Sequence, residues 1–286
     1  MTRGTLPFLI PALVATVALV LIPVLYTMWL SLTDQDIAGN NSGFVGFENF
    51  ALMFQNAEFW NSLFVTLQLF IVCLVVETIL GLGLGYLLSR DVPGRAIFQG
   101  LLLIPAITAS VAVALVWMLI YDPTLGAANQ ILQAVGLDPV VWLGSRAMAP
   151  WSIAIVDIWQ WTPFMALIIS AGIRSLPAEP FEAASIDGAG PVKKALFIGL
   201  PLLRSVLLVA MLLRTVDLIR FFDTIYIMTQ GGPVNATNTL NVYGYRAAFI
   251  DQEPSYAAAL QLSLFVLVIL IAAIFTFVRK RSTDVD

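Results

Sequence analysis

Six long apolar runs dominate the chain and limit what it can fold into. They cover residues 6–32, 62–88, 97–120, 151–173, 196–222 and 256–278. Each run exceeds the roughly 20 residues that an α-helix needs to cross the hydrocarbon core of a bilayer. Charged residues make up only 11% of the 286 residues, which leaves too little polar surface to cover a water-soluble core. The sequence therefore predicts an all-α integral membrane protein with six transmembrane helices.

Basic residues fall unequally on the two sides of these spans. If the N-terminus is cytoplasmic, most lysines and arginines outside the spans lie in inner segments, as the positive-inside rule requires. We therefore expect a multi-pass protein with both termini in the cytoplasm. The inner basic residues are Arg3, Arg90, Arg95, Arg174, Lys193, Lys194, Arg279, Lys280 and Arg281, whereas the outer loops hold Arg146 and Arg246.

Missing residue types exclude several kinds of chemistry. The chain has no histidine, so histidine-based zinc sites and Ser-His or Cys-His nucleophile pairs are excluded. Its one cysteine, Cys73, lies inside the second apolar run, where we expect a buried and inert thiol. No GxxxxGK[ST] loop is present, so any ATP-driven work needs a partner. The net charge of −4 gives no indication of nucleic-acid binding, and we expect neither an enzyme nor a metal site.

A polar stretch, EAASIDGAG, interrupts this apolar chain between the fourth and fifth spans. Within the loop 177–195 we expect a short helix over residues 182–186. Gly188 and Gly190 are expected to end it, because glycine readily adopts the positive φ of a helix C-terminus. A second helix is expected to begin at Pro191 and to enter the bilayer. The loop is cytoplasmic by the charge rule.

The spacing in this loop resembles the EAA signature of the membrane subunits of binding-protein-dependent ABC importers. Three further segments, TMWLSLTD, VGFENF and FDTIYIMTQGGPVNATNTLNVYGYRAAF, are similar to the carbohydrate-uptake branch and its maltose-permease-like first subunit. The resemblance covers about residues 6–281. The residues that carry the signature at matching distances are Glu182, Ala183, Ala184, Gly188, Ile198, Leu200 and Pro201.

The resemblance implies a type I ABC importer permease fold, with residues 1–286 as one transmembrane domain. In that family the EAA helix is the coupling helix, which docks in a cleft of a separate ATPase subunit. Small side chains permit such close approach, and acidic ones accept charge-assisted hydrogen bonds from the partner. The implied coupling residues are Glu182, Ala183, Ala184, Asp187 and Gly188.

The fourth span carries polar and aromatic residues at helical spacing. Asp157, Gln160, Trp161 and Phe164 stand at i, i+3, i+4 and i+7, hence on one helix face. Hydrogen-bonding groups beside flat apolar rings suit a sugar, whose hydroxyls and C–H faces need both. An acid within a span is expensive unless it faces a wet or paired interior. Packing of Asp157 against a neighbouring helix is the structural alternative.

The fifth span offers a second polar stripe. Arg214, Asp217, Arg220 and Asp223 follow each other at three-residue steps, so they can pair along the helix. Arg214 and Asp217 lie deeper, which favours a role at the substrate for them. Glu77 stands apart from both stripes, and hydrogen bonding to another helix or contact with a partner subunit both remain open. The resemblance carries sugar-contacting positions onto the fourth-span stripe and onto Ala106, Ser110, Arg214 and Leu218.

Two prolines inside the spans also allow two interpretations. Pro105 and Pro163 each remove a helix hydrogen bond, which in lipid is tolerated where neighbouring helices or water satisfy the freed carbonyl. They are either structural kinks or the means of opening a midplane cavity for a polar substrate.

The implied function is that of a permease subunit in an ATP-driven importer of the bacterial cytoplasmic (inner) membrane. It would translocate a carbohydrate, namely a sugar, an oligosaccharide or a sugar alcohol, by alternating access. The implied partners are a second related permease, two copies of a cytoplasmic ATPase that bind ATP and Mg²⁺, and an external solute-binding protein. This chain itself is expected to bind no cofactor.

Three alternatives stay open at this point. Arg214 leaves room for an anionic sugar phosphate such as glycerol 3-phosphate as the substrate. A proton-coupled secondary carrier would titrate Glu77, Asp157 or Asp217 and need no ATPase, but the EAA spacing disfavours it. A membrane enzyme would need a catalytic constellation in the polar loops, and the sequence contains none that we recognise.

Overall fold

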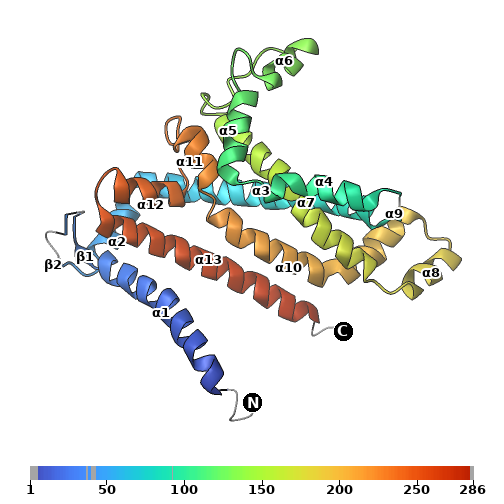
Figure 1. The fold of residues 1–286 in the computed structure, drawn as a ribbon, viewed down its shortest axis with the longest axis horizontal. Coiled ribbons are helices and arrows are strands. Elements are labelled where there is room, and N and C mark those ends of the chain that lie inside the picture. The colour runs from blue at the N-terminus through green and yellow to red at the C-terminus, as the bar shows by residue number, and fades with distance from the viewer. Residues whose placement is uncertain (1–5, 37, 40–42, 92, 284–286) are drawn as a thin grey trace. The chain divides into compact units, whose positions relative to one another are not determined.

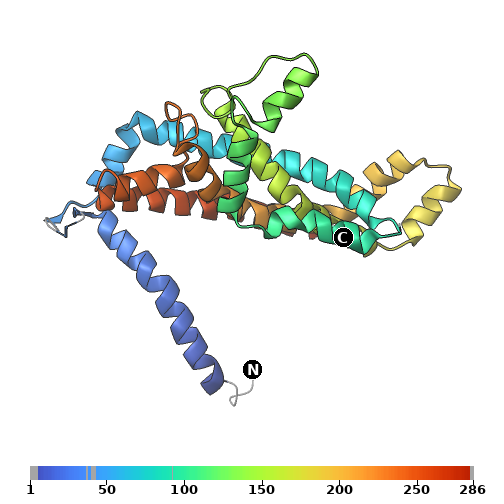
Figure 2. The same cartoon turned by 45° about the horizontal axis from the view of Figure 1, so that its top comes forward.

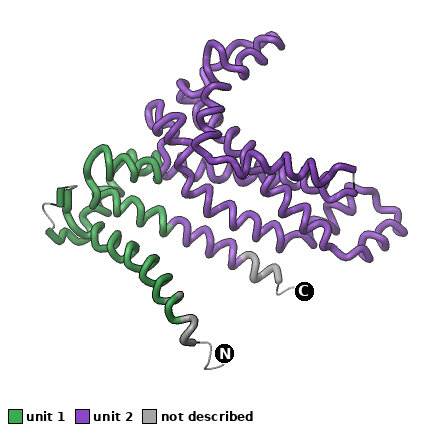
Figure 3. Tube along the Cα trace, in the orientation of Figure 1, with its two compact units in different colours: residues 1–62, 240–266 green, residues 63–239, 267–286 purple. Residues whose placement is uncertain are grey.

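The chain forms two compact units in a computed structural model that describes residues 6–36, 38–39, 43–91 and 93–283. The first unit comprises residues 1–62 and 240–266, and the second comprises residues 63–239 and 267–286 (Figure 3). The described residues are mostly helical, as the apolar runs predict.

The first unit brings the beginning of the chain together with residues close to its end. It contains α1 (Leu6–Ser31), α2 (Glu48–Gln55), α12 (Leu240–Phe249) and the first turns of α3 (Ala57–Ser89) and α13 (Pro254–Thr283). A two-residue strand, β1 (Thr33–Asp34), pairs antiparallel with β2 (Gly43–Phe44). The side-chain amide of Asn49 in α2 fixes this corner, because it donates to the backbone oxygens of Ser31 and Thr33 at 2.9 Å each.

The second unit holds most of the expected spans (Figures 1 and 2). Helix α7 packs against both α4 and α10, while α5 packs against α11. The loop helix α8 and the short helix α9 lie together at one end of the unit. The bounds are α4 (Arg95–Ile107), α5 (Ser110–Ile120), α6 (Ala127–Ala134), α7 (Ala149–Arg174), α8 (Glu179–Ile186), α9 (Pro191–Lys194), a π-helical segment (Ala195–Gly199), α10 (Leu200–Ile219) and α11 (Asp223–Thr229).

All six apolar runs are helical, but the third differs from the prediction. Five helical stretches are long and apolar enough to cross a membrane, or six if the bent pair of α4 and α5 counts as one span. The run 97–120 holds two helices rather than one, because α4 and α5 meet at 92°, close to the kink position that Pro105 suggested. The break begins at Thr108, whose backbone is extended and whose N–H donates to the Pro105 carbonyl at 3.2 Å rather than to the Ile104 carbonyl. Pro163, in contrast, lies within the uninterrupted α7.

Glycines bring the spans of the second unit close together. A Cβ on Gly85 of α3 would lie 2.8 Å from Ile169 Cγ2 and 3.0 Å from the Ala166 carbonyl oxygen of α7. At Gly172 of α7, a Cβ would lie 2.8 Å from Val206 Cγ1 of α10. Small residues allow this approach, which membrane helices need because lipid gives them little hydrophobic incentive to associate. The backbone frame around α7 is therefore tightly specified.

The loop between α5 and α7 contains a short helix, α6. Asn129 of α6 anchors the loop, because its side-chain oxygen accepts from the Val140 N–H and from the Trp142 indole N–H at 2.9 Å each. Asp122, just after α5, accepts the backbone N–H groups of Leu125 and Thr124. These hydrogen bonds hold the pKa of the Asp122 carboxyl below its usual value.

Candidate functional site

A buried charge cluster joins three helices of the second unit. Arg214 of α10 donates from Nε to Glu77 Oε2 of α3 at 2.7 Å, and from Nη2 to Glu77 Oε1 at 3.0 Å. The same Nη2 also donates to Asp157 Oδ2 of α7. The three side chains are 2%, 0% and 1% exposed, respectively. We call Glu77, Asp157 and Arg214 the buried triad.

The triad meets the requirement that buried ions be paired. Each of its members stands in an otherwise apolar span, where an unpaired charge would be expensive. Arg214 forms the bidentate, planar contact that guanidinium groups make with carboxylates. Cys73 Sγ also lies near the two carboxylates, with these candidate ligand atoms within 4.8 Å of one another. However, Arg214 already gives both carboxylates the positive charge that a bound cation would supply.

Aromatic side chains lie directly beside the triad. The Arg214 Cζ atom is 4.9 Å from the centroid of the Trp161 ring, which is within the range of a cation–π contact. Trp161 in turn contacts Phe164 edge to face, with centroids 6.0 Å apart and ring planes at 88°. Both rings are partly exposed. They are the members of the predicted α7 stripe that a molecule outside the unit can reach.

The two polar members of that stripe bond inside the unit instead. Asp157 belongs to the triad, and Gln160, only 2% exposed, donates from Nε2 to the Thr108 carbonyl oxygen at 3.2 Å. Gln160 therefore satisfies a backbone acceptor at the break between α4 and α5. The contact of Asp157 with Arg214 agrees with the alternative in which Asp157 packs against a neighbouring helix. Gln160 likewise bonds to a neighbouring segment of the chain.

The other residues predicted to contact the sugar differ in how exposed they are. Ser110, the first residue of α5, and Ala106 are partly exposed on either side of the break, whereas Leu218 is 2% exposed and belongs to the core. Asp217 is exposed, and Arg214 pairs across helices with the triad carboxylates rather than along α10 with Asp217. Pairing within the α10 stripe is therefore wrong for Arg214.

The sequence left the role of Glu77 open, and the structure gives it a partner. Of the two alternatives, the observed contact is the one with another helix of the same chain, through Arg214. One signal for this pairing was available: an acid and an arginine in two different apolar runs both need a counter-charge. Spacing alone did not show it, because the two residues are 137 positions apart.

The loop with the EAA signature forms a helical hairpin at the end of the second unit. Helix α8 ends at Ile186, and Gly188, just beyond the Asp187 cap, has a φ of +74°, which confirms the predicted left-handed conformation there. The expectation of a positive φ at Gly190 is wrong, because its φ is −68° and its backbone is extended. Lys194 Nζ donates to Ser185 Oγ at 2.6 Å and so ties α9 to α8. The residues assigned to coupling are exposed or partly exposed: Glu182, Ala183, Ala184, Asp187 and Gly188.

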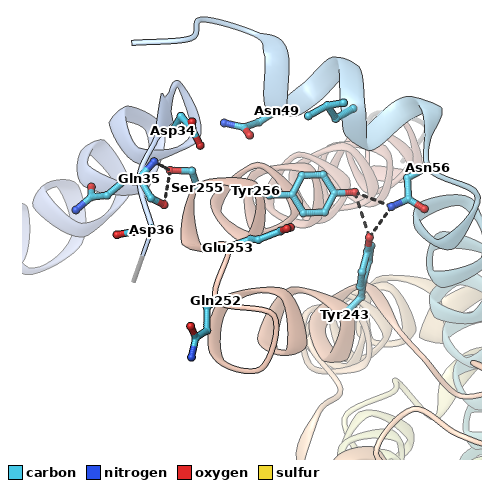
Figure 4. A pocket seen from close by; sticks show the side chains of 11 residues that line it. Asp34, Gln35, Asp36, Asn49, Asn56, Tyr243, Gln252, Glu253, Ser255 and Tyr256 are labelled. Atoms are coloured by element: carbon cyan, nitrogen blue, oxygen red, sulfur yellow. Dashed lines mark hydrogen bonds between the residues drawn. The ribbon is translucent and has the colours of Figure 1, made fainter. Parts of the chain in front are cut away.

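A polar hollow of about 420 Å³ lies in the first unit, where the sequence predicted no site (Figure 4). The side-chain nitrogen of Asn56 donates to the hydroxyls of Tyr243 and Tyr256 at 2.9 and 3.3 Å, and these hydroxyls are 3.1 Å apart. Burial raises the pKa of the Tyr243 hydroxyl further above neutral pH. The network joins the turn between α2 and α3 to α12 and α13, so its evident role is structural. Three acids, Asp34, Asp36 and Glu253, also line the hollow.

A broken span beside an aromatic and charged cluster, together with an exposed small-residue helix, defines a polytopic membrane protein of the transporter class. Residues 77–284 match the model of the family described as "Binding-protein-dependent transport system inner membrane component", and the chain belongs to this family. It is therefore a transport subunit rather than an enzyme.

Two relatives cover nearly the whole chain. The trehalose/maltose transport system permease protein MalF of Thermococcus litoralis is 35% identical over 96% of this chain and 93% of its own length. The sn-glycerol-3-phosphate transport system permease protein UgpA of Shigella flexneri is 30% identical over 96% of this chain and 95% of its own.

Solved structures support the same fold. The bacterial alginate ABC transporter, in complex with an alginate pentasaccharide-bound periplasmic protein, contains a chain that superposes with a TM-score of 0.83. The superposition covers 96% of this chain and 93% of that one, at 20% sequence identity. The type I importer permease fold predicted from the EAA signature is thereby confirmed.

Proposed function

We propose that this chain is a permease subunit that imports a carbohydrate across the bacterial cytoplasmic membrane by alternating access. The observation that carries the proposal is the pair of partly exposed rings, Trp161 and Phe164, held against the buried triad beside the broken span. Flat rings at such a position suit the C–H faces of a sugar, and the partly exposed Ser110 beside the break carries a hydroxyl that can bond to those of a sugar.

The charge of the site favours a neutral sugar over a sugar phosphate. The relatives include permeases named for both classes of substrate. A phosphate would need a free cation, but Arg214 is buried and already bonds two carboxylates. The triad therefore offers no uncompensated positive charge to an anionic substrate. A neutral sugar, oligosaccharide or sugar alcohol is the substrate class that we propose.

The proposed assembly includes partners that supply energy and substrate. We place a second permease beside this one and a solute-binding protein on the outer face. Two copies of a cytoplasmic ATPase, which bind ATP and Mg²⁺ themselves, drive the assembly. The exposed helix α8 is where this chain contacts the ATPase. The exposure of the small residues of α8 supports close contact with another protein. Both termini and α8 face the cytoplasm in this proposal.

Replacing Trp161 tests the substrate site. In proteoliposomes that contain the complete transporter and its own binding protein, we expect Trp161→Ala to slow uptake by up to about tenfold, since an aromatic contact contributes about 0.5–1.5 kcal/mol. Trehalose, maltose and sn-glycerol 3-phosphate are the first substrates to assay. Trp151→Ala is the matched control, because Trp151 is an exposed residue near the start of the same helix. Normal uptake by an assembled Trp161→Ala complex would contradict the proposed site.

A further inference from the structure

An apolar hollow of about 310 Å³ lies where the spans of the second unit meet the coupling loop. Its walls come from α3, the end of α7, helix α8, the π-helical segment and the start of α10. Apart from the phenol of Tyr86, the lining side chains are apolar, and they include Leu82, Leu176, Phe181, Leu196 and Leu203.

The hollow connects the membrane spans with the coupling helix. Its floor belongs to a core cluster in which Leu82 and Leu176 pack against the buried Leu203. Its rim includes Phe181 of α8, whose ring lies over Gly199, since a Cβ on that glycine would be 3.7 Å from a ring carbon. Phe181 is thus the α8 side chain that reaches from the coupling loop toward the membrane spans. A molecule that fills the hollow therefore contacts both α8 and the membrane spans.

Empty space remains in the hollow of this chain. Gly83 lines it, and a Cβ on Gly83 would meet no atom within 4 Å. An unfilled apolar space loses the dispersion contacts that its walls would otherwise make. The neighbouring Leu196 and Phe197 are 54% and 76% exposed, as expected for side chains in contact with lipid. In a bilayer, the acyl chains of the surrounding lipids are apolar groups that are always available to fill such a space.

Charge at the mouth of the hollow selects among lipids. The Arg90 guanidinium carbon lies 6.0 Å from the ring centroid of Tyr86, which lines the hollow. At this end of the spans Arg174 pairs with Asp91 at 3.3 Å, whereas the Arg90 guanidinium lies over the neutral ring of Tyr86. The acids of α8, Glu179 and Glu182, and the Asp187 that caps it are not part of the lining. Basic side chains beside gaps between spans attract anionic headgroups.

We propose that the hollow binds one acyl chain of an anionic phospholipid, with the lipid phosphate at Arg90. The bound chain contacts Phe181 and thereby stabilises the position of α8 relative to the spans. This site is separate from the substrate site, and the proposal does not depend on which sugar is carried.

Photo-crosslinking of the complete transporter tests the occupant. Phe181 is replaced by benzoylphenylalanine, and the complex is illuminated in nanodiscs of phosphatidylethanolamine with a minority of phosphatidylglycerol. Mass spectrometry then identifies the adduct. Benzoylphenylalanine at Phe197, an exposed residue of the same segment that is not part of the lining, reports on the surrounding bulk lipid. We expect phosphatidylglycerol to be enriched at position 181 over position 197.

Two further variants distinguish a specific site from general lipid contact. Gly83→Leu fills the hollow and should abolish the adduct at position 181, whereas Gly100→Leu, at another helical glycine with open space around it, should leave the adduct unchanged. Arg90→Gln keeps the hollow and should remove the preference for phosphatidylglycerol. An adduct with a partner polypeptide, the absence of a lipid adduct, or lipid of bulk composition at both positions would overturn the proposal. Uptake of sugar is not part of the readout, so the proposed transport function is tested separately.

Discussion

Arg214 compensates two carboxylates at once, which makes it the residue on which the centre of the second unit depends. Glu77 and Asp157 come from different helices, so the guanidinium connects α3 and α7 through α10. Removing one partner of a buried ion pair leaves the other charge unpaired, and this typically costs about 3–5 kcal/mol. Neutralising all partners together avoids most of that penalty. Single substitutions in the triad should therefore lower stability more than a substitution that neutralises all three residues together.

We expect Arg214→Met to lower the thermal stability and the assembly of the purified transporter more than any single change of its partners. Asp157→Asn should be milder, because Arg214 keeps its bidentate contact with Glu77. The triple variant Arg214→Met, Glu77→Gln and Asp157→Asn should recover much of the loss. Thermal unfolding followed by size-exclusion chromatography measures this order, with the exposed Arg146→Gln as the control. A triple variant less stable than Arg214→Met would contradict the pairing.

The sequence could predict which residues share a helix face, but it could not predict which of them are exposed. The spacing of Asp157, Gln160, Trp161 and Phe164 places them on one side of α7. Whether such a residue meets an opening or a neighbouring helix depends on partners that are distant in sequence, such as Thr108 for Gln160. For the same reason the three-residue steps on α10 suggested a partner for Arg214 on its own helix.

At the scale of elements, hydropathy predicts where helices lie but not where they bend. Residues 97–120 form one apolar run, and a hydropathy window averages across the 92° break at Thr108. Pro105 pointed to the region, and α4 ends two residues after it, at Ile107, where the backbone of Thr108 becomes extended. The π-helical segment Ala195–Gly199, which follows α8 and α9, was likewise not predicted, because its residues are ordinary helix formers apart from one glycine.

The cap of α8 gives a prediction at this scale. Gly188 has a φ of +74° and Gly190 a φ of −68°, and a Cβ on either would meet no atom within 4 Å. Gly188→Ala should therefore impose only backbone strain, about 1–2 kcal/mol for an L-residue in the left-handed region. We expect it to shift α8 and to lower transport per ATP hydrolysed, while Gly190→Ala behaves like the wild type. ATPase and uptake rates in the same vesicles measure this ratio, and equal ratios in both variants would refute the coupling role of the cap.

At the scale of the whole molecule, the sequence predicted the membrane class and the family, but the division into two units was not visible in it. Residues 240–266 group with residues 1–62, nearly the full length of the chain away. Such contacts include the hydrogen bond from the Gln35 backbone N–H to Ser255 Oγ at 2.8 Å. Hydropathy carries no information on which distant segments associate, since it is evaluated one window at a time.

The proposed orientation gives a prediction for the chain as a whole. If α8 faces the cytoplasm and the loop after α11 faces outward, a membrane-impermeant maleimide should label Val234→Cys in intact cells and should label Ile186→Cys only after the cells are opened. Both positions are well exposed, at 75% and 88%, so a difference in labelling reports their side of the membrane rather than their burial. The native Cys73 is 0% exposed and gives a silent background. Labelling of Ile186→Cys in sealed cells would reverse the orientation, and the basic residues around α8 would then lie on the side that the positive-inside rule disfavours.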